Sequence, residues 1–298
     1  MAGLTLASPS AERGVYSPWR ETWRRYRRHK LAVVSAFLLL ALIAAVVLGP
    51  FLWKVPINDI DFNARLEGPS LAHPFGTDSF GRDVLTRVLF GGRVSLLVSL
   101  VGVSLACICG VAAGLAAAWH GGWVDAVLMR AADLVFSFPS FVLALFLMVV
   151  LGASVATVAA AIALVYVPIF ARLTRNLALM IKEEPFVQAA RLMGQPTSRI
   201  LFAEILPNIS APIMVQASIG IAFAVVIEAG LSFLGLGVQS PLPSLGVIMA
   251  DGREYFQRGP WVLTLTGLFI STALLGLNLL GDGIRDLTDP RLRERMGG

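Results

Sequence analysis

One carboxylate stands apart from the other charged side chains of this sequence. Glu228 lies within a long apolar stretch, 211–236, whereas the other charged residues lie outside or at the ends of such stretches. An ionised carboxylate inside a membrane is costly unless it faces a bundle interior, water or a partner. Two interpretations follow. Glu228, with Ser232 one helical turn later, faces a path through the membrane and recognises a positive group, or it makes a structural hydrogen bond near a helix end.

No grouping of residues typical of catalysis accompanies this carboxylate. The sequence contains neither a Gly-x-x-x-x-Gly-Lys-Ser/Thr phosphate loop nor a His-Glu-x-x-His zinc motif, and its three histidines lie in separate segments. Cys107 and Cys109 lie two apart in one apolar stretch, so on a helix they would point to different sides. We therefore expect this chain to be no enzyme and to hold no metal or cofactor of its own.

A second set of charged residues lies in a glycine-rich segment before residue 94. Asp78, Arg82, Asp83 and Arg87 follow one another at helix or turn spacings. Either these charges pair with each other and hold a folded loop, or they contact a substrate directly. The sequence leaves both interpretations open.

Composition indicates that lipid surrounds most of this chain. Of the 298 residues, 56% are hydrophobic and 14% are charged, whereas soluble domains carry roughly 25% charged residues. A helix that crosses a membrane needs about 20 predominantly apolar residues. Six stretches approach that length, namely 31–53, 94–119, 134–151, 155–170, 211–236 and 262–280. We predict an all-α, polytopic membrane protein with six transmembrane helices.

Positive charge predicts the orientation of these helices. With the N-terminus inside, 17 of the 24 Lys and Arg residues fall in inner segments, which is the bias of cytoplasmic loops. Both termini are therefore predicted to be cytoplasmic. In the basic tail, residues 1–30, Trp19, Trp23 and Tyr26 have the spacing of an amphipathic elbow helix in the membrane interface. We expect this tail to bind lipid head groups and not nucleic acid.

The longest inner segment, 171–210, contains a short predicted helix. Pro185 suits a first helical turn, and Gly194 followed by Pro196 ends the helix after a few turns. A helix of this length is unstable alone in water. We therefore expect another surface to pack against it.

This segment resembles the EAA loop of bacterial ABC importer permeases. In that family Glu-Ala-Ala, a glycine four residues after the second alanine and a later Leu-Pro recur; here Gln188 replaces the glutamate, and Glu204 stands where an aliphatic residue is common. The family's short helix is a coupling helix that docks into a groove on the ATPase. The resemblance implies a coupling contact formed by Phe186, Gln188, Ala189, Ala190, Met193, Gly194, Leu206 and Pro207.

Three further segments are similar to the second permease of dipeptide, oligopeptide and nickel importers. They are HPFGTD at 73–78, EAGLSFLGLG at 228–237 and NLLGDGIRD at 278–286. The likeness implies the type I ABC importer permease fold. In it, 31–93 would form the first transmembrane helix and an extracytoplasmic loop, and 94–298 the core permease domain with five helices, a coupling loop at about 171–210 and a cytoplasmic C-terminal tail. The extracytoplasmic signature corresponds to Thr77, Asp78, Gly81, Arg82 and Asp83.

The resemblance also implies a function and a set of partners. We expect a permease subunit of an ATP-driven peptide importer in a bacterial inner membrane, with nickel, glutathione or another small solute as the alternative cargo. Its partners would be a homologous second permease, two ABC ATPases that bind ATP and Mg, and an extracytoplasmic binding protein. An ion-coupled transporter or a membrane enzyme would need more intramembrane polar groups than Glu228 supplies.

Overall fold

The computed structural model describes residues 30–239 and 242–288, and within these ranges the regular structure is helical. The all-α prediction is therefore confirmed for this part of the chain, while the predicted elbow helix around Trp23 lies outside it. Thr77 and Asp83 form an isolated β-bridge. The elements are α2 (Lys30–Leu52), η1 (Phe62–Ala64), α3 (Val84–His120), α4 (Gly122–Phe136), α5 (Ser140–Leu151), α6 (Val155–Lys182), α7 (Pro185–Leu192), α8 (Thr197–Arg199), the π-helix η2 (Ile200–Ile205), α9 (Leu206–Phe233), α10 (Leu245–Arg253) and α11 (Pro260–Thr288).

Four helices in the described ranges are long and apolar enough to cross a membrane. They are α3, α6, the continuous helix Thr197–Phe233 that α8, η2 and α9 form together, and the Pro260–Gly283 part of α11. A fifth span results if α4 and α5 count as one, and α2 contributes a shorter apolar stretch, Ala36–Leu52. A polytopic membrane protein is thus confirmed, and the count of six spans stays a prediction.

The predicted third span, 134–151, is broken at Pro139 and contains the end of one helix and the whole of the next. α4 and α5 are bent by 87° relative to each other across the break that contains Pro139. Proline has no amide hydrogen to donate and disfavours helical backbone in the residue before it. α4 therefore ends at Phe136, and α5 begins at Ser140. The sequence signal for this break is Pro139 itself, not a change in hydropathy.

Two other predicted spans are longer than their apolar stretches. α3 begins at Val84 instead of residue 94, and α6 continues to Lys182 instead of ending at residue 170. Charged side chains end an apolar stretch without ending a helix, because they can point to solvent while the opposite face stays buried. The predicted coupling loop, 171–210, is consequently mostly helical, and the predicted domain boundary between 93 and 94 falls inside α3.

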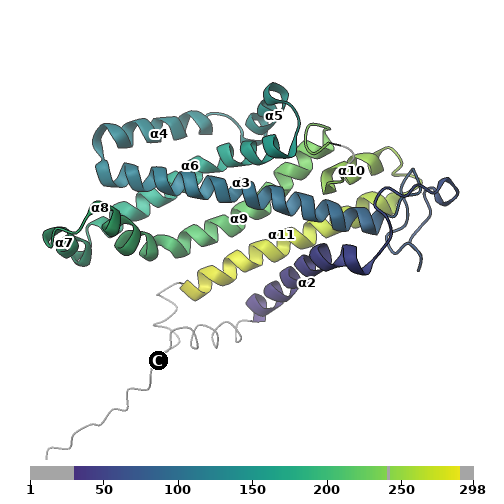
Figure 1. Ribbon diagram of the computed structural model, residues 1–298, viewed down its shortest axis with the longest axis horizontal. Helices are drawn as coiled ribbons and strands as arrows, with labels where there is room; N and C mark the ends of the chain where they lie inside the picture. Colours follow the sequence, from purple (N-terminus) through teal and green to yellow (C-terminus); the bar gives the residue numbers. More distant parts are fainter. Residues whose placement is uncertain (1–29, 240–241, 289–298) are drawn as a thin grey trace, which may run out of the picture.

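α3 and α6 form the centre of the molecule because small residues let them approach closely. Gly102, Ala106, Gly110 and Gly114 recur every fourth position of α3, which places them on one helical face. A Cβ atom at Gly110 would lie 2.6 Å from the Cβ of Phe170 on α6. Such a stripe is typical of closely packed membrane helices. Figure 1 shows the two helices side by side.

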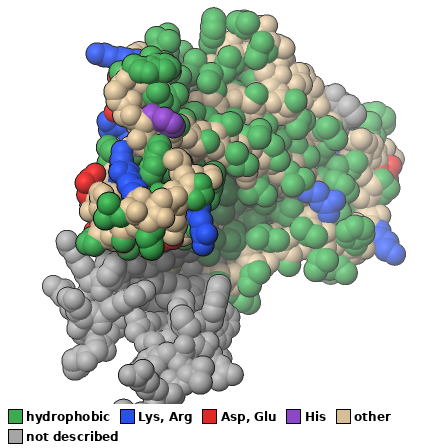
Figure 2. All heavy atoms as spheres, turned by 60° about the vertical axis from the view of Figure 1, so that its left-hand side comes forward, with side chains coloured by type: hydrophobic (Ala, Val, Ile, Leu, Met, Phe, Trp, Pro, Cys, Tyr) green, Lys and Arg blue, Asp and Glu red, His purple; other side chains and the backbone are tan. Residues whose placement is uncertain are grey.

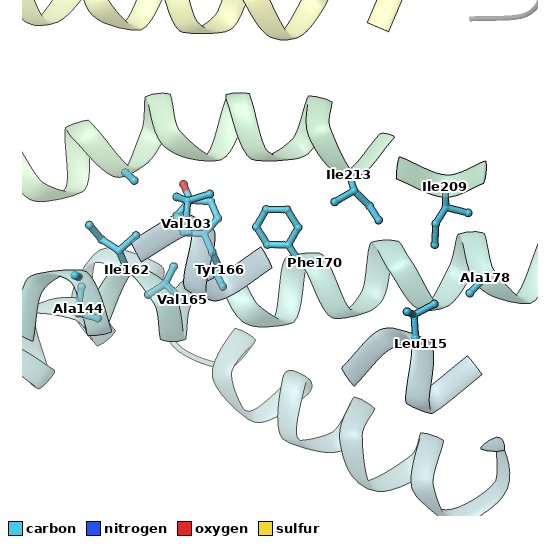
Figure 3. Close-up of a cluster of buried hydrophobic side chains, with 14 of the residues drawn as sticks. Val103, Leu115, Ala144, Ile162, Val165, Tyr166, Phe170, Ala178, Ile209 and Ile213 are labelled. Atoms are coloured by element: carbon cyan, nitrogen blue, oxygen red, sulfur yellow. The ribbon is translucent and has the colours of Figure 1, made fainter. Parts of the chain in front are cut away.

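The main hydrophobic core extends from this pair toward α9. Figure 3 shows Tyr166 and Phe170 of α6 between α3 and α9, with Ile213 and Ile209 of α9 continuing the cluster toward one end. The same cluster includes buried residues of α5 and α7. The core therefore ties the short helix α7 to the central helices.

The two ends of the bundle differ in structure. α7 and α8 lie at one end, which we name the α7 end, and residues 53–83 with α10 lie at the other (Figure 1). We name residues 53–83 the lobe. Figure 2, with the α7 end turned forward, shows Lys and Arg side chains gathered there and mainly hydrophobic side chains along the body behind it. This distribution suits a body surrounded by lipid with a basic end in water.

Candidate functional site

Local sequence fixes both ends of α7. Pro185 lies in the first turn, where a missing amide hydrogen breaks no helical bond. At the other end Gly194 has φ of 72°. Its amide donates to the carbonyl of Arg191 at 2.9 Å, and the next amide, of Gln195, donates to that of Ala190 at 3.1 Å. This pair of bonds is a Schellman motif, so the predicted limits of the helix are confirmed.

α7 buries one face and exposes the other. Val187 and Ala190 are buried in the main core. On the other face Leu192 is 89% exposed and Met193 is 70% exposed, although both side chains are apolar. The predicted coupling residues fall into three groups: Phe186, Ala189, Met193, Gly194 and Pro207 are exposed, Gln188 and Leu206 are half-buried, and Ala190 is buried.

Gln188 ties α7 to the end of α6. Its Nε2 donates to the carbonyl of Lys182 at 3.3 Å and lies 3.5 Å from a carboxylate oxygen of Glu183. A glutamate here could not donate to that carbonyl, and it would face Glu183 with like charge. The glutamine that departs from the resembled motif thus has a contact of its own within the chain.

The lobe is organised around two buried carboxylates, of which Asp78 is the first. It is 3% exposed. It accepts hydrogen bonds from the amides of Phe80 and Arg82, at 2.8 and 3.0 Å, and from the Nε of Arg82 at 2.7 Å. Nη1 of Arg87 lies 3.5 Å away. Asp78 therefore closes the turn that follows it and neutralises the arginines beside it.

Asp83, the second carboxylate, starts α3. It accepts from the amide and the hydroxyl of Thr86 at 2.8 and 2.7 Å, which is the bonding of an N-cap aspartate. The indole Nε1 of Trp53 donates to it at 3.1 Å, and Nδ1 of His73 lies 2.9 Å from it. One side chain thus joins the first residue of the lobe, its middle and the start of α3.

Thr77 and Gly81 complete the fold of the lobe. The Thr77 hydroxyl bonds to the carbonyl of Ala64 and accepts from the amide of Glu67 at 2.9 Å. Gly81 has φ of 78°, and a Cβ there would lie 1.8 Å from the carbonyl oxygen of Asp61, so only glycine fits. All five predicted signature residues therefore lie together and bond within this chain. Their contact with a substrate stays a prediction.

Asp251 on α10 links the lobe to the far end of the sequence. It accepts from Nη2 of Arg87 at 3.1 Å and lies 3.4 Å from Nη2 of Arg82. The pKa of Asp251 lies above its ordinary value, because the effect of burial outweighs the lowering by the two guanidinium groups. The indole Nε1 of Trp261 adds a bond to the carbonyl of Thr77 at 3.1 Å. The sequence gives no local signal for these partners, because more than 160 residues separate them.

Glu228 lies in a buried polar cluster of this chain. It is 0% exposed, and its Oε1 accepts from the hydroxyl of Ser232 at 2.7 Å. The hydroxyls of Ser95 on α3 and Ser244 at the start of α10 also face the carboxyl group. Oε2 has no hydrogen-bond partner among the described residues. The predicted neighbours Glu228 and Ser232 are thus brought together, and the two further serines were missed because they are distant in sequence.

The serines of this cluster also bond to backbone. Ser232 accepts from the amide of Val238 at 3.1 Å, Ser95 from that of Leu245 at 3.3 Å, and Ser244 caps α10 through the amide of Val247. The cluster therefore joins α3, α9 and α10. Within the described ranges no three His, Cys, Asp or Glu side chains gather as a metal site requires.

Two protein families match this chain. The family described as binding-protein-dependent transport system inner membrane component matches residues 110–294, which is more than half of the sequence and includes α7 and Glu228. The family described as N-terminal TM domain of oligopeptide transport permease C matches residues 17–69.

Curated relatives match over nearly the whole chain. The dipeptide transport system permease protein DppC of Alkalihalophilus pseudofirmus is 40% identical over 285 residues, covering 96% of this chain and 94% of the relative. The glutathione transport system permease protein GsiD of Pectobacterium atrosepticum is 38% identical over 283 residues, covering 95% and 94%.

A solved structure has a similar fold. It is an inward-facing conformation of the MetNI methionine ABC transporter, of which one chain is 19% identical to this one. The TM-score is 0.54, and the match covers 67% of this chain and 95% of the other. The likeness supports the predicted type I importer fold for the shared part of the chain.

Proposed function

This chain belongs to the family of binding-protein-dependent transport system inner membrane components, and we propose that it is the permease subunit of an ATP-driven importer of dipeptides or short oligopeptides. The choice of peptide is supported by the relative named as a dipeptide permease, which matches 96% of this chain. Glutathione is the alternative supported by the second relative. Nickel or another small solute remains the third candidate.

The exposed face of α7 carries the proposal that this chain is driven by a separate ATPase. Phe186, Leu192 and Met193 present apolar side chains to the surroundings at the basic end of the molecule. Exposed apolar patches of this kind mark interaction sites. In this proposal an ABC ATPase subunit receives α7 in a groove. ATP and Mg are bound by two such subunits, and not by this chain.

The proposed orientation places the α7 end and both termini in the cytoplasm. The lobe and α10 then face the extracytoplasmic side, where a binding protein delivers the substrate, and a homologous second permease completes the pathway across the bacterial inner membrane. The concentration of Lys and Arg at the α7 end supports this orientation (Figure 2).

The contacts of this chain suit alternating access. Closure of the ATPase pair on ATP displaces α7, whose buried residues Val187 and Ala190 lie in the same core as α3, α6 and α9. Because a packed core transmits displacement instead of absorbing it, the spanning helices shift with α7. Hydrolysis then releases the ATPase pair, and the chain returns to the state open to the cytoplasm.

Reconstitution tests this function. The chain is purified with the second permease, the ATPases and the binding protein encoded beside it, and the complex is placed in liposomes. We expect uptake of a radiolabelled dipeptide that requires both ATP and the binding protein, and that an excess of other dipeptides abolishes. Uptake without ATP would contradict the ATP-driven importer. ATP-dependent uptake of labelled glutathione or of a labelled nickel chelate, with no uptake of the dipeptide, would select the alternative cargo.

A further inference from the structure

Trp119, near the end of α3, lies beside two cationic side chains. The guanidinium carbon of Arg191 on α7 is 4.4 Å from the centroid of its indole, and Nζ of Lys182, the last residue of α6, is 5.7 Å from it. Both distances fall within the roughly 6 Å range of cation–π attraction. One half-buried aromatic side chain therefore joins α3, α6 and α7.

Lys182 also fixes the end of α3 directly. Its ammonium group donates to the carbonyls of Ala118 and Trp119 at 2.8 and 3.0 Å. These carbonyls belong to the last turn of α3, where backbone acceptors lack partners within the helix. Close packing of Gly114 against α6 continues the contact inward. The C-terminal ends of α3 and α6 are therefore bonded to each other.

Arg191 makes the contact from the side of α7. Its Nε is buried and has no hydrogen-bond partner in the described part of the chain, so the indole is the contact that the structure gives its guanidinium group. The next residue, Leu192, is 89% exposed. The exposed face of α7 and the Trp119 contact therefore lie one residue apart along the helix.

α3 is a long helix without a proline. Its 37 residues span about 55 Å. Its sequence contains no proline, whereas α6 contains Pro168 and α9 contains Pro212. Near its other end, Ser95 accepts from the amide of Leu245 on α10 at 3.3 Å. α3 therefore connects Trp119 to α10 without a proline break.

We propose that Trp119 is the positioning residue through which displacement of α7 by the ATPase reaches α3. In this proposal Arg191 moves with α7, while Lys182 holds the indole against the end of α6. This inference rests on the proposed function, and it predicts that losing the indole separates ATP hydrolysis from transport without abolishing either the assembly or the hydrolysis.

The test measures substrate imported per ATP hydrolysed by the reconstituted complex. Trp119→Leu removes the aromatic face, Trp119→Phe keeps it, and Arg191→Met keeps the stem of the side chain without its charge. Trp123→Leu is the matched control, because this tryptophan lies four residues later and is 78% exposed. We expect Trp119→Leu and Arg191→Met each to lower the ratio at least about threefold, since a cation–π contact of ordinary strength corresponds to a factor of that order.

Trp119→Phe and Trp123→Leu should stay near wild type. The Trp119→Leu/Arg191→Met double variant should match Trp119→Leu, because loss of the indole already removes the contact with Arg191. A parallel fall of hydrolysis and uptake, or multiplied effects in the double variant, would overturn the inference. If Trp119→Leu does not assemble, Arg191→Met and Trp119→Phe decide: an unchanged ratio in Arg191→Met overturns it. A wild-type complex without ATP-driven uptake contradicts the proposed function itself.

Discussion

Glu228 carries its carboxyl group into the interior of the chain, where serine hydroxyls meet it. Full burial and the 2.7 Å bond from Ser232 favour the structural interpretation of this residue in the conformation described. A role in recognising a positively charged substrate stays a prediction. The two interpretations predict different results when the carboxylate of Glu228 is replaced by an amide.

For Glu228 we predict that shape and hydrogen bonding matter more than charge. Glu228→Gln keeps an acceptor for Ser232 and adds a donor for the other serines, so uptake and melting temperature should stay near wild type. Glu228→Leu leaves buried hydroxyls without this partner and should lower the free energy of unfolding by about 1–3 kcal/mol. Melting in detergent and the range of imported substrates are the measurements. A stable Glu228→Gln variant with altered substrate selectivity would establish the recognition role instead.

Gly194 and Gly235 form a matched pair for testing the coupling surface. Both have positive φ, and a Cβ on either meets nothing within 4 Å, so valine strains each backbone by about 1–3 kcal/mol. Gly194 follows α7, whereas Gly235 follows α9 at the opposite end. We predict that Gly194→Val lowers substrate imported per ATP and that Gly235→Val does not. Equal values of substrate imported per ATP in the two variants would show that Gly194 is not part of the coupling contact.

Residues were predictable where their signal is local. Pro185 and Gly194 delimit α7 through backbone preferences that the sequence states directly, and Asp78 with Arg82 pair across four positions. The role of Trp119 was not predictable, because its partner Arg191 on α7 lies 72 positions later and Trp119 itself belongs to no recognised motif. The same holds for Asp251.

Close packing of α3 against α6 requires small residues on the face of α3 that contacts α6. The small residues of α3 place its backbone against α6, and even a methyl group at Gly110 would come within 3 Å of Phe170. Interiors packed this closely relax only at a cost. The stripe therefore sets the distance between the two helices that end together at Trp119.

We predict that Gly110→Ala destabilises the protein by about 1–3 kcal/mol through overpacking. Gly267→Ala on α11 is the control, because a Cβ there meets only Met249, at 3.9 Å, and alanine favours a helix over glycine by about 1 kcal/mol. Thermal unfolding of both purified variants is compared with wild type. Equal melting temperatures for the two variants would refute the close packing.

Apolar stretches predicted which helices exist better than where they end. The centres of the predicted spans at 94–119, 155–170 and 211–236 lie within α3, α6 and α9. Their ends moved because amphipathic turns continue a helix beyond the apolar part. The bend at Pro139 and the π-helix before Pro207 depend on backbone hydrogen bonding, to which a hydropathy pattern is insensitive.

At the scale of the whole molecule, the proposed orientation is open to direct labelling. Leu71 in the lobe is 100% exposed and Leu192 on α7 is 89% exposed. In a background with Cys107→Ala and Cys109→Ala, we predict that an impermeant maleimide labels Leu71→Cys from the outside of right-side-out vesicles. Leu192→Cys should react only after permeabilisation. The reverse pattern would invert the orientation.

The ion pair between Arg87 and Asp251 can form only late in translation. Asp251 follows Arg87 by 164 residues, and at about 5–20 residues per second a ribosome adds that length in roughly 10–30 s. Until then Arg87 has only Asp78 beside it, and the lobe lacks its support from α10. A segment in the last fifth of the chain therefore completes the fold of one in the first third. A chain interrupted before α10 therefore leaves Arg82 and Arg87 without their second carboxylate partner.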